Sequence, residues 1–86
     1  MTPVTPFWFK QRQAKAEEAG PNVLRVSGPN LKEAIVGIRQ GEGGLWSAFL
    51  RADADGPDID ATAPTIATAY AAWEAAFEMY RRHLVV

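Results

Sequence analysis

Cysteine is absent from the 86-residue sequence, and histidine occurs once, at His83. Without cysteine the chain cannot form a disulfide, a thiolate metal site or a cysteine nucleophile, which excludes zinc ribbons and thiol enzymes. A histidine-rich metal site and a histidine–carboxylate base lack their parts, and neither Ser27 nor Ser47 has a base within reach in the sequence pattern. We therefore expect a protein that is not an enzyme, with no catalytic residue and no cofactor, and we expect His83 to cap the end of a helix.

Long hydrophobic runs are also missing. The first residues contain no basic segment followed by an apolar stretch, so no secretory signal is visible. A membrane span needs about 18 uninterrupted apolar residues, and the alanine-rich C-terminal segment is interrupted by Glu74, Glu78, Arg81 and Arg82. These absences predict a cytoplasmic protein with no membrane partner.

Charge of one sign is lacking as well, since 9 Lys and Arg face 10 Asp and Glu, for a net charge of -1. Nucleic-acid-binding domains are usually strongly basic, so this balance disfavours a nucleic-acid partner. A chain of 86 residues is enough for one domain of residues 1–86. So small a domain buries only about 60–65% of its unfolded-chain surface, which makes a homodimer one candidate assembly.

Residues 1–21 are expected to form an N-terminal arm. Thr5-Pro6 is typical of a helix start and Gly20-Pro21 of a helix end. The residues between them include good helix formers but no apolar stripe, so the arm is either a short helix or a fraying segment. Its three aromatic residues, Phe7, Trp8 and Phe9, are interpreted as a packing anchor.

Residues 22–52 are predicted to form an antiparallel sheet of three strands at 22–27, 32–39 and 45–51. β-Branched residues mark the first two runs, the third reads as another extended run, and the glycine-rich segment 40–44 joins the last two as a hairpin. Because side chains alternate along a strand, one face of the sheet is expected to form the core. Its members are Leu24, Val26, Ala34, Val36, Ile38, Trp46, Ala48 and Leu50.

Residues 53–64 read as an acidic loop with carboxylates at Asp53, Asp55, Asp58 and Asp60. Oxygen ligands at alternating positions suit Ca²⁺, but a calcium loop of the EF-hand type needs a glutamate at its twelfth position, where this chain has Pro64. Asp and Gly are ordinary turn residues, so a solvated loop is favoured over a metal site.

Residues 65–84 carry the strongest helical pattern, and Pro64 places the start of the helix at about Thr65 or Thr68. Apolar residues recur at spacings of four and three, at Ile66, Tyr70, Trp73, Phe77, Tyr80 and Leu84. The sequence therefore predicts the α+β class, with a three-stranded antiparallel sheet, a long C-terminal helix packed on one face and a short N-terminal helical arm.

The opposite face of this sheet has a mixed composition. Arg25, Arg39, Phe49 and Arg51 all point to it by alternation. Exposed apolar surface of this kind usually has a reason, so the face is covered by the N-terminal arm, buried in a homodimer or used for binding. We hypothesise a non-enzymatic binding or protein-interaction module, with a protein partner or a second copy of the chain on these four residues.

The strand pair also resembles a known family. Gly37-Ile38-Arg39-Gln40, followed after four residues by Leu45 to Arg51, is similar to the "GVRQ...W.AEIR" strands of plant AP2-type DNA-binding domains, and residues 71–77 resemble that family's helix, "AYDEAAF". The resemblance implies DNA contacts in the major groove from Arg39, Trp46 and Arg51. The chain departs from the family at its acidic loop and at residues 41–44, which replace a basic hairpin tip. An AP2-like DNA-binding domain is therefore the alternative function.

Overall fold

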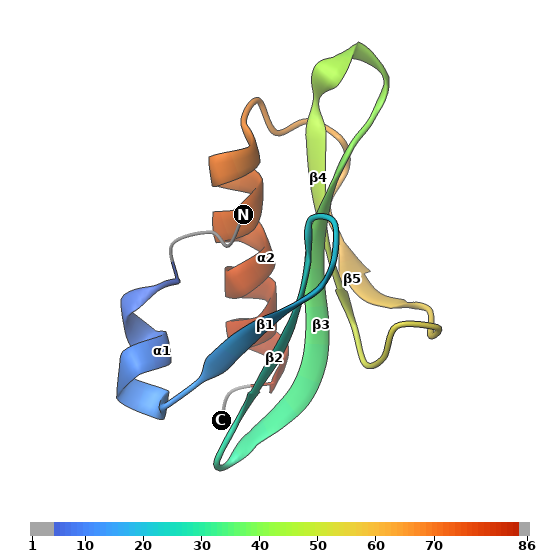
Figure 1. Ribbon diagram of the computed structural model, residues 1–86. Helices are drawn as coiled ribbons and strands as arrows, with labels where there is room; N and C mark the ends of the chain where they lie inside the picture. Colours follow the sequence, from blue (N-terminus) through green and yellow to red (C-terminus); the bar gives the residue numbers. More distant parts are fainter. Residues whose placement is uncertain (1–4, 85–86) are drawn as a thin grey trace.

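The fold comprises two helices and one sheet, as seen in a computed structural model that describes residues 5–84 (Figure 1). The helices are α1 (Phe7–Arg12) and α2 (Ala69–Leu84), and a short 3-10 turn, η1 (Glu42–Gly44), lies at the β3–β4 hairpin tip. The strands are β1 (Lys15–Gly20), β2 (Val23–Gly28), β3 (Leu31–Gln40), β4 (Trp46–Arg51) and β5 (Asp58–Ala61). All neighbouring strands pair antiparallel in the order β1-β2-β3-β4-β5. The α+β class and the C-terminal helix are confirmed, but three strands understate a sheet of five.

The first additional strand lies in the expected N-terminal arm. The helix of this arm ends after Arg12 because Gln13 takes a left-handed conformation, with φ of 57°, and its N–H turns back to the Lys10 carbonyl. The chain then continues as β1, which pairs with β2 from Lys15 opposite Ser27 to Gly20 opposite Val23. The helix-forming composition of this segment is thus overridden by pairing with a neighbouring strand.

The second additional strand lies in the expected acidic loop. β5 pairs with β4 through Phe49 and Ala61, Leu50 and Asp60, and Arg51 and Asp58, with an irregularity between Leu50 and Arg51. The expected loop is therefore divided by β5 into residues 52–57 before it and residues 62–64 after it, and the two later carboxylates belong to a strand at the edge of the sheet.

α2 begins at Ala69, which agrees with the later of the two expected starts and not with a start at residue 65. Thr68 ends the preceding segment, and its Oγ1 accepts a hydrogen bond of 3.1 Å from the backbone N–H of Ala71, as a helix N-cap does. Ile66, expected on the helix, instead forms an isolated antiparallel bridge with Trp46, with backbone hydrogen bonds of 2.7 and 3.0 Å.

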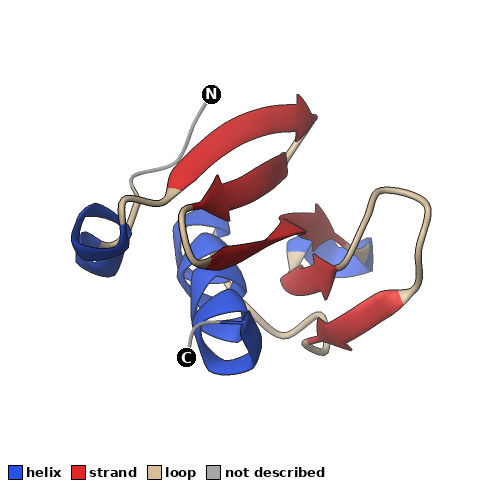
Figure 2. Ribbon diagram, turned by 90° about the horizontal axis from the view of Figure 1, so that it is seen from below, coloured by secondary structure: helices blue, strands red, loops and turns tan. Residues whose placement is uncertain are grey.

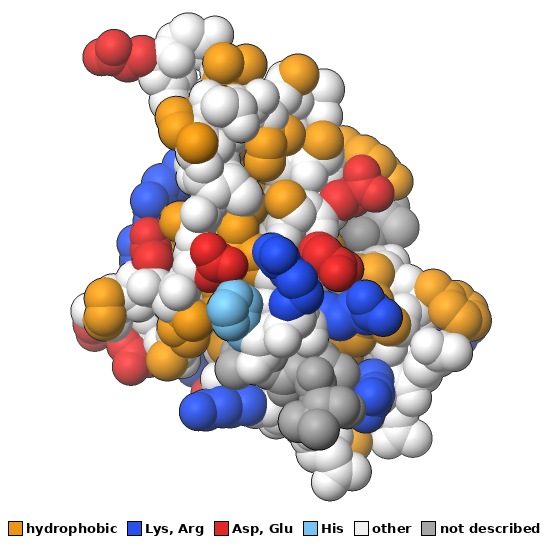
Figure 3. Space-filling model, turned by 180° about the vertical axis from the view of Figure 1, so that it is seen from behind, with side chains coloured by type: hydrophobic (Ala, Val, Ile, Leu, Met, Phe, Trp, Pro, Cys, Tyr) orange, Lys and Arg blue, Asp and Glu red, His pale blue; other side chains and the backbone are white. Residues whose placement is uncertain are grey.

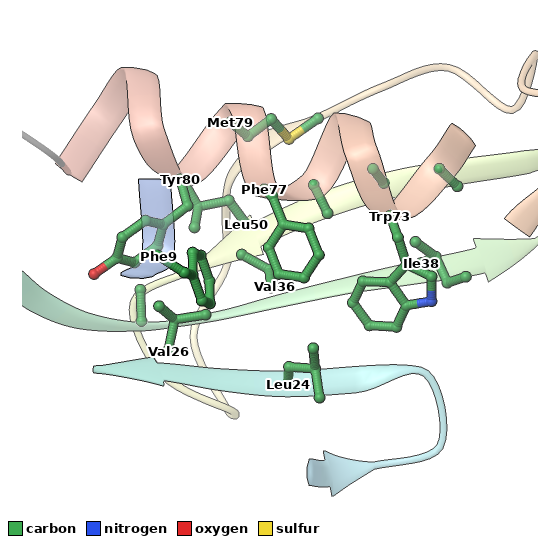
Figure 4. Close-up of a cluster of buried hydrophobic side chains, with 14 residues drawn as sticks. Phe9, Leu24, Val26, Val36, Ile38, Leu50, Trp73, Phe77, Met79 and Tyr80 are labelled. Carbon is green, nitrogen blue, oxygen red and sulfur yellow. The ribbon is translucent and has the colours of Figure 1, made fainter. Parts of the chain in front are cut away.

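The core lies on one face of the sheet, against α2, as expected (Figure 4). Trp73, Phe77 and Tyr80 of the helix stripe are buried there, whereas Tyr70 is 67% exposed and the side chain of Leu84 lies outside the described residues. The sheet contributes seven of the residues named from the sequence, with Trp46 half-buried beside them: Leu24, Val26, Ala34, Val36, Ile38, Ala48 and Leu50.

α1 packs on the same face as α2. Phe9 is 3% exposed and meets the Phe77 ring edge-on at 5.2 Å between ring centroids, and Trp8 stacks on Tyr80 at 5.9 Å. Figure 2 shows both helices on one side of the curved sheet. The aromatic anchor is therefore real for Trp8 and Phe9, while Phe7 is 75% exposed. The expectation that the N-terminal arm covers the other sheet face is therefore wrong for residues 5–20, because α1 packs on the α2 side and β1 is itself a strand of the sheet.

Candidate binding surface

The sheet face turned away from both helices, here called the outer face, carries the four residues singled out from the sequence. Arg25 lies opposite Ile35, and Ile35 lies opposite Arg51 on the next strand. Phe49 lies opposite Gly37, two residue pairs further along the same two strands and therefore on the same face. Alternation places these side chains on the side opposite Leu24, Val36 and Leu50 of the core.

Phe49 is buried although it does not belong to the main core. It is 4% exposed, and its ring lies over Gly37, where an added Cβ would come within 2.8 Å of the Phe49 Cε1 atom and of the Asn22 carbonyl oxygen. A glycine in a strand interior leaves a gap above the backbone, and an aromatic ring from the neighbouring strand can fill it. Gly37 is therefore needed here for close approach and not for a turn.

Two arginines complete the cover of Phe49. The guanidinium carbon of Arg39 lies 4.2 Å from the ring centroid, and that of Arg51 lies 4.8 Å from it. Both distances are within the range of cation–π contacts. The apolar residue expected on this face is thus shielded by its own neighbours, so neither the arm nor a second chain is required to bury it.

A carboxylate closes the group. Asp58 Oδ1 accepts a hydrogen bond of 2.7 Å from Arg51 Nε and one of 3.4 Å from an Nη of Arg39. The hydrogen bond from Arg51, together with the charges of both arginines, lowers the pKa of Asp58 in spite of partial desolvation. We call Arg39, Phe49, Arg51 and Asp58 the outer-face cluster. The sequence did not identify Asp58 as a member, because its position opposite Arg51 follows from β5, a strand that the sequence did not predict.

Arg25 lies on the same face but outside this cluster. Its Nη1 is 3.5 Å from an Oε of Glu33, an ion pair with both side chains about half exposed. Exposed pairs of this kind contribute little to stability, roughly 0–1 kcal/mol. Arg25 therefore adds positive charge to the outer face without being held as firmly as Arg51.

The carboxylates of segment 53–60 point to different partners. Asp53 Oδ1 accepts a hydrogen bond from the backbone N–H of Asp55, Asp58 faces the two arginines, and Asp60 lies on the other side of the sheet. Within the described part of the chain, no group of three or more carboxylate or imidazole side chains could hold a metal ion. The four carboxylates that suggested a calcium loop are thus divided between loop 52–57 and the two faces of the edge strand β5.

His83, which was expected to cap the end of the helix, also contacts a carboxylate that the sequence did not reveal as its partner. Its Nε2 lies 2.9 Å from Asp60 Oδ2, and Arg82 Nη2 lies 4.0 Å from the same atom. These contacts join the end of α2 to β5, in the region of mixed charge visible in Figure 3. The contact with His83, followed by that with the Ala61 N–H, lowers the pKa of Asp60. The pair is exposed, with 40% of the His83 side chain accessible, and it links the C-terminal end of α2 to β5.

One open pocket of about 420 Å³ lies beside the β1–β2 turn and is lined by residues 20–24, Glu18 and Trp73. Among these lining residues, Glu18 is the one carboxylate.

The three residues that the family resemblance implies do not share a face. Arg39 and Arg51 lie on the outer face, whereas Trp46 packs on the core side through its bridge to Ile66. Within residues 5–84, neither helix has both the length and the apolar composition needed to cross a bilayer. Comparison of the chain with protein-family models, with curated proteins and with solved structures finds no match in any of the three.

Proposed function

We propose that this chain is a non-enzymatic protein-interaction module that binds its partner on the outer face of the sheet. One observation carries the proposal: α1 and α2 both pack on the core side, so no described element covers the outer face. Three arginine side chains stand on that open face, and they are 46% (Arg25), 47% (Arg39) and 29% (Arg51) exposed.

The chemistry of the face favours an acidic protein segment as the partner. Guanidinium groups donate up to five hydrogen bonds and match carboxylates in shape, and arginine is enriched at protein interfaces. Arg39 and Arg51 are already held against the Phe49 ring, so less side-chain entropy is lost when they engage a partner. The balanced net charge of -1 supports a partner recognised locally over one recognised through a long phosphate backbone.

An AP2-like DNA-binding domain is the second candidate. It is favoured by the arrangement of a helix on one face of the sheet and Arg39 and Arg51 on the other. Trp46 on the core side and Asp58 among the arginines count against it.

An amide-resolved NMR titration at low salt tests both candidates, with capped hexaglutamate and mixed-sequence duplex DNA as probes. We expect the peptide to shift the amides of Arg25, Arg39, Phe49 and Arg51, and we expect Arg39→Gln to weaken binding more than Lys10→Gln. Lys10 lies in α1, on the core side, so its substitution removes the same charge away from the face. Shifts with DNA alone that fade as salt is added would favour the second candidate, and a spectrum unmoved by both probes would refute binding at this face. Sedimentation of the chain alone tests whether the partner is a second copy.

A further inference from the structure

We propose that the outer-face cluster is a carboxylate-binding site, that Asp58 occupies it in the isolated chain, and that an acidic peptide segment binds by displacing Asp58. This inference rests on the function proposed above and adds to it the chemical group that is recognised and an internal competitor. It follows from the way in which Asp58 contacts the two arginines.

Both guanidinium groups converge on one oxygen of Asp58. Arg51 reaches Oδ1 through Nε at 2.7 Å, and Arg39 reaches the same atom through one Nη at 3.4 Å. Two cations directed at one carboxylate oxygen form a site that suits a carboxylate. The contact is nevertheless incomplete, because a guanidinium group binds a carboxylate best through two parallel N–H···O bonds. A carboxylate that arrives from outside, without the constraint of the Asp58 backbone, can adopt that geometry.

The site itself is fixed in place before any ligand arrives. Phe49 lies between Gly37 below and the guanidinium groups above, at 4.2 and 4.8 Å from the ring centroid. A partner therefore meets two arginines whose positions are already limited by packing, which lowers the entropy lost on binding. Displacement of Asp58 leaves these contacts between arginine and ring intact.

Asp58 is also placed where it can leave. It is the first residue of β5, directly after loop 52–57, and its pairing with Arg51 lies beyond the irregularity in the β4–β5 ladder. Its side chain is 28% exposed, so the carboxylate can reach solvent when it is released. A partly exposed ion pair contributes little free energy, so competition from Asp58 should weaken the binding of an incoming carboxylate by only about two- to fivefold.

The test compares Asp58→Asn with Asp55→Asn, using isothermal titration calorimetry with capped hexaglutamate at low salt. Each variant removes one negative charge from the same segment, but only Asp58 contacts the arginines. We expect Asp58→Asn to bind the peptide about two- to fivefold more tightly than the unmodified chain, and Asp55→Asn to change the affinity less. Circular dichroism confirms that both variants are folded.

The outcomes separate this inference from the function on which it rests. If the unmodified chain binds and Arg39→Gln weakens binding, but Asp58→Asn gains no more than Asp55→Asn, the face is a binding surface and Asp58 is not its competitor. If Asp58→Asn binds where the unmodified chain does not, the competition is supported in its strongest form. If neither the unmodified chain nor Asp58→Asn binds, both proposals fall.

Discussion

Replacing Gly37 with alanine is the most direct test of the packing on the outer face. An added Cβ would come within 2.8 Å of the Phe49 ring and of the Asn22 carbonyl oxygen, closer than side-chain carbons approach in folded proteins. The Asn22 carbonyl cannot easily move, because it accepts the N–H of Ile38 at 3.0 Å. The ring is confined as well, by the guanidinium groups of Arg39 and Arg51.

The magnitude follows from two opposing effects. Overpacking at a confined position costs about 1–3 kcal/mol. The reduced backbone freedom of alanine in the unfolded chain returns about 0.4–1 kcal/mol. We therefore expect Gly37→Ala to lower the free energy of unfolding by about 1–2 kcal/mol, which corresponds to a melting temperature lower by roughly 5–15 °C for a domain of this size.

Urea unfolding followed by circular dichroism measures the effect, with Gly41→Ala as the matched control. Gly41 has a φ of -93°, and the nearest atom to an added Cβ there is 3.6 Å away, so this substitution should leave stability unchanged or raise it slightly. In a Phe49→Ala background the cost of Gly37→Ala should shrink, because one of the two clashing groups is gone. Equal stability of Gly37→Ala and the unmodified chain would refute the placement of the ring over Gly37.

Three further predictions concern the helices and the titrating groups. Phe9 is buried, so Phe9→Ala should lower the free energy of unfolding by about 3–4 kcal/mol in the same urea assay. Phe7 is exposed, so Phe7→Ala should change it by less than about 0.5 kcal/mol. Similar losses from the two substitutions would contradict the packing of α1. The pKa values of Asp58 and Asp60 are lowered in the fold, so stability that is present at neutral pH should be lost as the pH falls below about 4. Asp58→Asn should reduce the slope of the free energy of unfolding against pH in this range. An unchanged slope in acid urea titrations would argue against the pairing of Asp58 with the arginines. Burial raises the pKa of Tyr80, so the folded chain keeps this phenol protonated where the unfolded chain ionises it. The free energy of unfolding should therefore fall as the pH rises above about 10. Tyr80→Phe, which removes a hydrogen bond of 2.5 Å to the Lys32 carbonyl, should make this fall shallower in alkaline urea titrations. A fall as steep as in the unmodified chain would show that another group causes it.

The sequence predicted those parts of the fold whose patterns are long and periodic. Alternation in β2, β3 and β4 was sufficient to assign the two faces of the sheet, and the spacing of Trp73, Phe77 and Tyr80 was sufficient to assign the buried side of α2. β1 could not be found in this way, because its lysine, glutamate and alanine residues favour a helix in the absence of a neighbouring strand.

The candidate site was predictable to the same degree. Arg39, Phe49 and Arg51 could be placed together because they belong to two strands that the hairpin fixes in register. Asp58 and Asp60 could not be given partners, since a four-residue strand with two aspartates gives no strand signal of its own. The contact of each with Arg51 or His83 depends on tertiary pairing that a single sequence does not reveal.

The sheet also ends in charge at both edges. β1 carries Lys15, Glu17 and Glu18, and β5 carries Asp58 and Asp60. An edge strand is a template on which a strand of another molecule can add, and charged side chains are a common means of preventing such growth. Two copies meeting through β5 would bring aspartates against aspartates. The charged edges should therefore hinder the edge-to-edge pairing of identical molecules into one continuous sheet, even at high protein concentration.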